Sequence, residues 1–121
     1  MGRKILFITS DQQRYDALGC NGGTIARTPV LDALSRAGIT FDRAHPQNVV
    51  CMPSRSTMLT GQHVSTHGVW MNGVPLPEDA PSIAADLRGA GYATALIGKA
   101  HFEPLLDPFL RFTENRLGAE R

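Results

Sequence analysis

The sequence predicts an α/β fold with a largely parallel sheet, because segments typical of strands alternate along it with segments typical of helices. Strands are expected at residues 5–9, 39–41 and 92–97, and helices at 29–37, 53–60 and 81–88. With 121 residues, the chain is long enough for one domain with a hydrophobic core. In such folds ligands gather at the carboxyl ends of strands, so polar segments there are the first candidates for a site.

Each expected element has its own local signals. Residues 5–9 are a continuous apolar run with β-branched members, the pattern of a strand buried in a parallel sheet. Thr28 and Pro29 suit the N-cap and first position of a helix, which Gly38 ends. That helix has one apolar face, formed by Val30, Leu31, Leu34 and Ala37. Gly61 closes the next helix, residues 62–80 read as a loop, and the tail from 105 to 121 is expected to be partly helical.

Composition excludes several classes of function. The formal net charge is +1 and the basic residues are spread along the chain, which gives no footprint for nucleic acid or an anionic membrane. No apolar stretch approaches the length of a membrane span. The first apolar run is too short for a signal peptide and lacks a cleavage site, so a cytoplasmic location is expected. The two cysteines, Cys20 and Cys51, make no disulfide framework.

Cys51 lies two residues before Pro53, just outside the expected start of a helix. Free N–H groups and the helix dipole favour anions at such a position, and they stabilise negative charge on a nucleophile. Arg55 is one helical turn further on and can reach the same space. Together these groups suit a tetrahedral oxyanion such as sulfate or phosphate. The alternative is a small buried cysteine before an ordinary helix.

Residues 51–61 read CMPSRSTMLTG, which is similar to the signature of the type I sulfatases, C-x-P-S-R followed by L-T-G. The resemblance implies that a formylglycine-generating enzyme oxidises Cys51 to Cα-formylglycine. One hydroxyl of the aldehyde hydrate would attack the sulfur of a sulfate monoester and expel the alcohol. Deprotonation of the other hydroxyl would then release sulfate and restore the aldehyde. Met52 is the variable position of the signature and is expected to pack rather than react.

Asp11 and Gln12 follow the first expected strand, where carboxylate and amide oxygens could hold a hard cation. They could equally be loop or cap residues. The resemblance favours a metal, because sulfatases place ligands here, and it adds the formylglycine at Cys51 as a further ligand. Ca²⁺ is the first expectation, with Mg²⁺ and Mn²⁺ as alternatives. The commoner sulfatase pattern at this position is Asp-Asp. The Asp-Gln-Gln sequence of this chain resembles phosphonate monoester hydrolases and choline-sulfatase-like proteins more closely.

Residues 98–101 read GKAH, similar to the family motif G-K-x-H. The resemblance implies that Lys99 balances the sulfate charge and that His101 helps to remove the hydrate proton. A nucleotide-binding P-loop is excluded, because Ala93 and Ala100 replace residues that its pattern requires.

Three other polar residues, His63, His67 and Asn72, are weaker candidates. His63 and His67 are four apart, but no Glu follows His63 as in H-E-x-x-H, so a loop-stabilising role is favoured. His67 also lies in a stretch similar to the one that follows L-T-G in sulfatases, and it could support the pocket. Asn72 resembles a substrate-contacting asparagine of the phosphonate monoester hydrolases, although Asn-Gly is also a strong turn pair.

Taken together, the resemblance implies an alkaline-phosphatase-like α/β fold, with a largely parallel sheet between helices, and a sulfuric ester hydrolase. Residues 1–121 are expected to be the N-terminal part of the catalytic domain and inactive alone, because the family's later metal ligands and leaving-group acid are missing. The expected partners are a small sulfate ester and the formylglycine-generating enzyme, with no nucleic acid and no membrane. Two alternatives stay open: a phosphonate monoester or phosphodiester hydrolase, and a non-catalytic anion-binding fragment.

Overall fold

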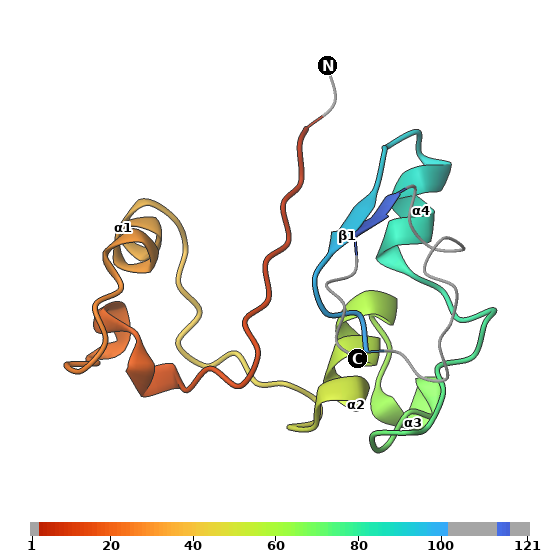
Figure 1. Cartoon of the computed structure of the whole chain (residues 1–121), viewed down its shortest axis with the longest axis horizontal. Coiled ribbons are helices and arrows are strands. Elements are labelled where there is room, and N and C mark those ends of the chain that lie inside the picture. The colour runs from red at the N-terminus through yellow and green to blue at the C-terminus, as the bar shows by residue number, and fades with distance from the viewer. Residues whose placement is uncertain (1–2, 102–113, 117–121) are drawn as a thin grey trace. The chain divides into compact units, whose positions relative to one another are not determined.

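The computed structural model of the chain describes residues 3–101 and 114–116 (Figure 1). The chain divides into two compact units, Met1–Ala44 and His45–Arg121. Among the described residues, no helix combines the length and the apolar character that crossing a membrane would require.

The first unit contains two short 3-10 helices, η1 (Tyr15–Ala17) and η2 (Gly19–Asn21), and one α-helix, α1 (Pro29–Ala37). The predicted helix is therefore confirmed with its bounds. Two side chains tie η2 to α1. The Gly19 N–H donates to Thr28 Oγ1 at 2.8 Å, and the Cys20 N–H donates to Asp32 Oδ1 at 2.8 Å. The Thr28 hydroxyl also donates to Asp32 Oδ1, and these bonds lower the pKa of the Asp32 carboxyl.

The strand predicted at residues 5–9 is wrong: this segment is not paired in a sheet, and Leu6 is 84% exposed. The strand predicted at 39–41 is also wrong, because these residues form no strand and Ile39 and Phe41 are exposed. An apolar, β-branched run favours an extended backbone, but a strand also needs a hydrogen-bonded neighbour. The described part of the first unit supplies none, so the local pattern alone was not sufficient.

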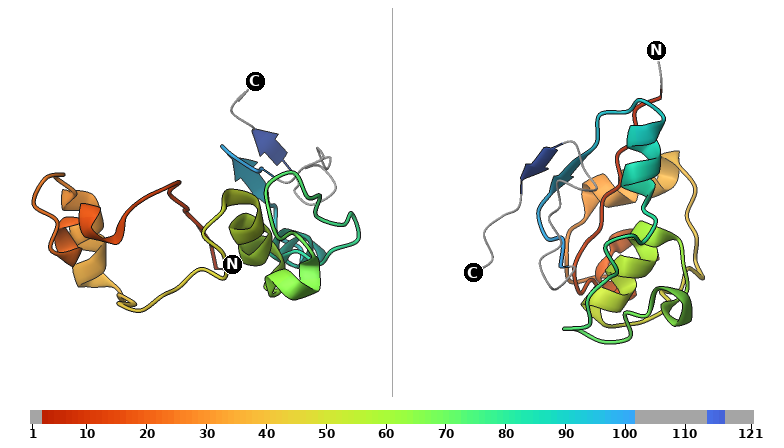
Figure 2. Two further views of the ribbon diagram at one scale, coloured as in Figure 1. Left: turned by 90° about the horizontal axis from the view of Figure 1, so that it is seen from below. Right: turned by 90° about the vertical axis from the view of Figure 1, so that its right-hand side faces the viewer.

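The second unit contains three helices in its described part: α2 (Cys51–Thr60), α3 (Val64–His67) and α4 (Ile83–Gly89). α2 packs against both α3 and α4 (Figure 2). Gly61 ends α2 in the left-handed conformation, with φ 68°, as its position in the sequence predicts. The short helix α3 differs from the loop predicted at residues 62–80, because this segment is rich in Gly and Pro.

Two short strands, β1 (Ala95–Ile97) and β2 (Glu114–Arg116), pair in parallel, with Leu96 opposite Asn115. Parallel pairing agrees with the predicted sheet type, although β1 is shorter than predicted. β2 falls in the tail that is expected to be partly helical, and these three residues form a strand. The rest of the tail lies outside the described residues.

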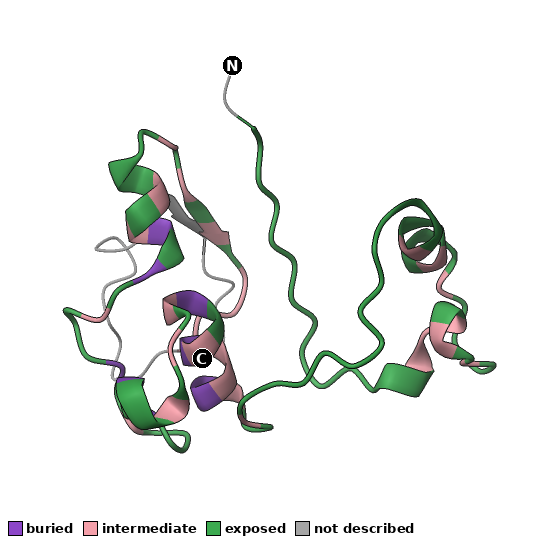
Figure 3. Ribbon diagram, turned by 180° about the vertical axis from the view of Figure 1, so that it is seen from behind, coloured by how far each residue is buried: buried purple, intermediate pink, exposed green. Residues whose placement is uncertain are grey.

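The core of the described residues lies entirely in the second unit (Figure 3). One face of α2 supplies Met52 and Leu59, at a spacing of two helical turns. The chain that follows α2 adds the remaining buried apolar residues, Val69, Leu76 and Ala84. Met52 is 0% exposed, which agrees with the packing role predicted for it. The core therefore fixes α2 and, with it, the residues at the start of this helix.

Candidate functional site

Cys51 is the first residue of α2, so the helix begins earlier than the predicted start at Pro53. Val50 is the N-cap, and its carbonyl accepts the Ser54 N–H at 3.1 Å. Pro53 fits inside the first turn because N–H groups there have no helical partner to lose. Cys51 is half-buried, whereas Cys20 lies exposed in the first unit, and the two cysteines form no disulfide.

The N–H groups at the start of α2 are largely used by the protein itself. The Val50 N–H donates to Asn48 Oδ1 at 2.8 Å, and the Met52 N–H donates to Asn72 Oδ1 at 3.0 Å. Pro53 has no N–H. The prediction that free N–H groups would form an anion site here is therefore wrong for Val50 and Met52, whose N–H groups already have partners.

Arg55 links α2 to the turn that follows β1. Its Nη1 donates to the Lys99 carbonyl oxygen at 2.8 Å, across 44 residues of sequence. Gly98 opens this turn with φ 94°, a conformation that glycine adopts at no steric cost. The fold thus brings the Cys51–Arg55 turn of α2 to the segment that carries Lys99 and His101.

The backbone is strained at two of the predicted site residues. Gln12 and His101 each have φ 54°, and they are the non-glycine residues with positive φ in the described part of the chain. Such conformations cost about 1–3 kcal/mol and cluster at functional sites. In addition, His101 Nδ1 is buried without a hydrogen-bond partner among the described residues. An unsatisfied buried nitrogen is unfavourable for folding.

Asp11 and Gln12 lie exposed in the first unit. Their carboxylate and amide oxygens are ligands that a hard divalent cation prefers, and so far they fit the expected metal. A Cys51 thiolate is a soft ligand that does not suit Ca²⁺ or Mg²⁺, whereas a formylglycine oxygen does. No group of three or more His, Cys, Asp or Glu side chains that could hold a metal forms within the described residues.

His63 and His67 do not form a metal pair. His63 Nδ1 is 2.9 Å from the Gln47 side-chain oxygen at the surface, whereas His67 is buried. His67 Nδ1 accepts the Val69 N–H at 3.1 Å, so the ring proton of the neutral form must be on Nε2, 3.0 Å from Thr57 Oγ1. Burial lowers the pKa of His67 and keeps it neutral. His67 therefore joins α2 to the loop that follows α3.

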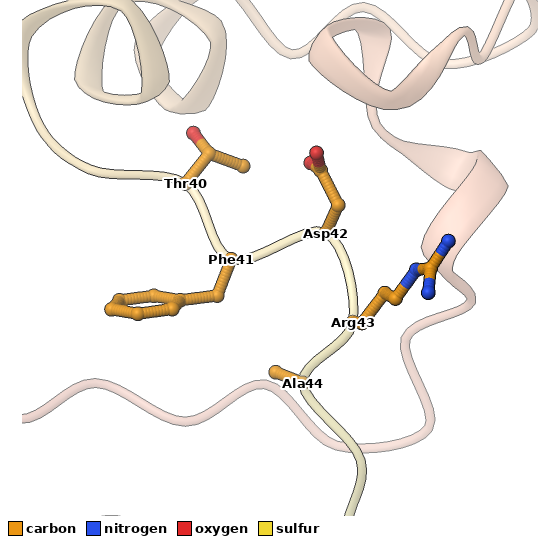
Figure 4. Close-up of a pocket in the computed structure, with 5 residues that line it drawn as sticks. All are labelled: Thr40, Phe41, Asp42, Arg43 and Ala44. Atoms are coloured by element: carbon orange, nitrogen blue, oxygen red, sulfur yellow. The ribbon is translucent and has the colours of Figure 1, made fainter.

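A surface hollow of about 420 Å³ is lined by five consecutive residues, Thr40–Ala44 (Figure 4). Its side chains include none of the predicted site residues, and Phe41 and Arg43 point in different directions (Figure 4). A binding site normally has convergent polar groups from separate segments, which this bend of the chain lacks.

Comparison with known proteins gives a consistent result. Residues 3–107 match the sulfatase family model. An ulvan-active sulfatase of Formosa agariphila is 35% identical over 83% of this chain, and an arylsulfatase of Clostridium perfringens is 34% identical over 98% of it. The crystal structure of a phosphonate monoester hydrolase from Agrobacterium radiobacter superimposes with a TM-score of 0.76 at 29% identity over 93% of the chain.

The chain spans only part of each of these proteins. It covers 20% of the Formosa sulfatase, 27% of the Clostridium arylsulfatase and 25% of the Agrobacterium hydrolase.

Proposed function

Because the chain belongs to the sulfatase family, we propose that it carries the nucleophile of a sulfuric ester hydrolase that acts on sulfate monoesters. Its fold is the N-terminal portion of the alkaline-phosphatase-like α/β fold that sulfatases share with phosphonate monoester hydrolases. The nucleophile would be a formylglycine made from Cys51 by a formylglycine-generating enzyme. The activity would belong to the complete protein, since this chain spans only 20% to 27% of the three relatives described above.

The observation that best supports this proposal is the hydrogen bond from Arg55 to the Lys99 carbonyl. It joins the signature helix, where the formylglycine would stand, to the turn with Lys99 and His101. When present, the formylglycine hydrate would supply one oxygen to attack sulfur and a second whose proton must leave before sulfate is released. Arg55 and Lys99 would bind the negative oxygens of the ester, and His101 would take that proton. Two motifs that are separate in sequence would thereby serve one reaction.

A divalent cation would complete the site. Asp11 and Gln12 would hold it together with the formylglycine oxygen, and its charge would stabilise the negative charge of the sulfate. With one carboxylate from this chain, Ca²⁺ remains the first candidate, followed by Mg²⁺ and Mn²⁺. The strained backbone at Gln12 supports a functional reason for an amide side chain there.

Hydrolysis of phosphonate monoesters or phosphodiesters is the second candidate. The Asp-Gln-Gln sequence at residues 11–13 favours it, as does the structural similarity to two phosphonate monoester hydrolases. The Lys-Ala-His sequence at 99–101 favours the sulfatase. Both reactions would use the same nucleophile on different tetrahedral centres.

Steady-state kinetics of the full-length protein, produced together with a formylglycine-generating enzyme, tests the proposal. Matched aryl sulfate, phosphodiester and phosphonate monoester substrates share one leaving group, so kcat/KM compares the tetrahedral centres directly. We expect the aryl sulfate to be preferred and Cys51→Ala to abolish turnover. A phosphonate or phosphodiester preference of orders of magnitude would replace the sulfatase by the second candidate.

Mass spectrometry of the peptide that contains Cys51 distinguishes both enzymes from a non-catalytic anion-binding protein. We expect the cysteine to have lost its sulfur and to carry an aldehyde. An intact thiol in protein made beside the competent maturation enzyme would contradict the catalytic proposal altogether.

A further inference from the structure

Asn72 holds the start of the signature helix from outside it. It lies in the turn between α3 and α4, and its Oδ1 accepts the Met52 N–H at 3.0 Å. Met52 directly follows Cys51 in the first turn of α2. A side-chain oxygen that accepts an N–H in the first turn satisfies a donor that the helix itself leaves unpaired. Asn72 therefore acts as a capping residue supplied across 20 residues of sequence.

The turn that carries Asn72 is itself fixed on both sides. Before it, Val69 is 0% exposed and its N–H is held by His67 Nδ1. After it, the Gly73 N–H lies 3.0 Å from Met52 Sδ, and φ 89° at Gly73 allows the sharp turn. Asn72 cannot shift far without breaking these contacts. The position of its Oδ1 is thus determined by the core of the second unit.

From this geometry we infer that Asn72 is a positioning residue, which orients the nucleophile at position 51 by holding the Met52 N–H. The inference rests on the proposed function, and it differs from the substrate contact that the resemblance implies. The amide oxygen of Asn72 is already committed to Met52. Because Cys51 and Met52 share a peptide plane, a shift of the Met52 N–H also moves the backbone from which the nucleophile projects.

Two variants separate positioning from substrate contact. Asn72→Ala removes the acceptor, whereas Asn72→Asp keeps an oxygen that can accept the Met52 N–H but loses the amide donors. In the full-length protein we expect kcat to fall roughly 10- to 100-fold in Asn72→Ala, the size of effect that a misplaced reacting group produces. Asn72→Asp should restore kcat, while its added negative charge raises KM for an anionic substrate. Asn21→Ala, the same change in the first unit, serves as the control.

Amide hydrogen exchange provides a readout that does not depend on activity. In the full-length protein with Cys51 unconverted, the Met52 amide should exchange faster in Asn72→Ala than in the wild type, and Asn72→Asp should restore its protection. Unchanged exchange in Asn72→Ala would overturn the inference, as would a kcat in Asn72→Asp as low as in Asn72→Ala. Faster exchange with unchanged kcat in Asn72→Ala would also overturn it. If the wild type hydrolysed no substrate, the proposed function would fail, whereas exchange would still report the Asn72–Met52 bond.

Discussion

The two units of the chain are stabilised in different ways. Residues 3–44 contain no buried residue, and their main tertiary links are the polar bonds of Thr28 and Asp32 to η2. The second unit has a core of apolar side chains around α2, with Met52 and Val69 fully buried. Consequently, the geometry around Cys51 depends on packing, whereas the backbone after Gln12 depends on a few hydrogen bonds. A residue's sensitivity to substitution should follow this difference.

The largest effect is expected from the core of the second unit. Met52→Ala in the full-length protein removes a side chain that is 0% exposed and leaves a cavity. We therefore expect the free energy of unfolding to fall by about 2–5 kcal/mol. Met58→Ala is the matched control, since Met58 is 42% exposed on the same helix. For Met58→Ala the free energy of unfolding should change by no more than about 0.5 kcal/mol. Urea unfolding measures both variants, and equal losses would contradict the assignment of the core to this face of α2.

A smaller effect is expected in the first unit. Asp32→Ala removes the acceptor for the Cys20 N–H and the Thr28 hydroxyl, so the contact between η2 and α1 should open more readily. Hydrogen exchange at the amides of Gly19, Cys20 and α1 measures it directly. Asp42→Ala, which replaces an exposed aspartate of the same unit, should leave these rates unchanged. Unchanged exchange in Asp32→Ala would show that other contacts hold η2 to α1.

The smallest effect is the pH dependence contributed by His67. Burial lowers its pKa in the folded state, so below the unfolded value of about 6.5 the unfolded chain binds the proton more readily. Its contribution to stability is therefore fully present above that pH. The contribution is lost progressively as the pH falls toward the lowered pKa. At pH 6 only part of the unfolded chains carry the extra proton, which keeps the loss small.

Urea unfolding at pH 7.5 and pH 6 checks this expectation. The wild type should lose stability between the two values by more than His67→Gln, whose side chain does not titrate in this range. An equal change in both proteins would assign the pH dependence to other groups.

Sequence reasoning succeeded where short-range signals determine the structure. The helix at Pro29–Ala37 and the glycine that ends α2 follow from residues within one turn of each other. It failed at residues 5–9 and 39–41, since strand formation depends on a partner segment that the local pattern does not specify. The apolar pattern also did not identify the buried face of α2, because the polar residue Ser56 lies between Met52 and Leu59 on that side of the helix.

Prediction of the site has the same limit. The signature around Cys51 and the Lys99–His101 motif were recognised as patterns, and the bond from Arg55 to the Lys99 carbonyl brings the two segments together. The capping oxygens of Asn48 and Asn72 were not foreseen as such. The Asn48 side chain accepts the N–H of Val50, two residues later. This is a local motif that the sequence alone could have indicated. Asn72 lies 20 residues from its partner, and only the folded chain shows that contact.

The left-handed backbone at Gln12 and His101 has a consequence for anyone who redesigns this protein. A procedure that optimises stability alone would place glycine at both positions, because glycine relieves the strain there. The resulting chain would fold at least as well and would lose two side chains that the proposed chemistry requires. At these two positions, stability favours glycine whereas the proposed activity requires the present side chains. Both residues should therefore be kept in any stabilised variant.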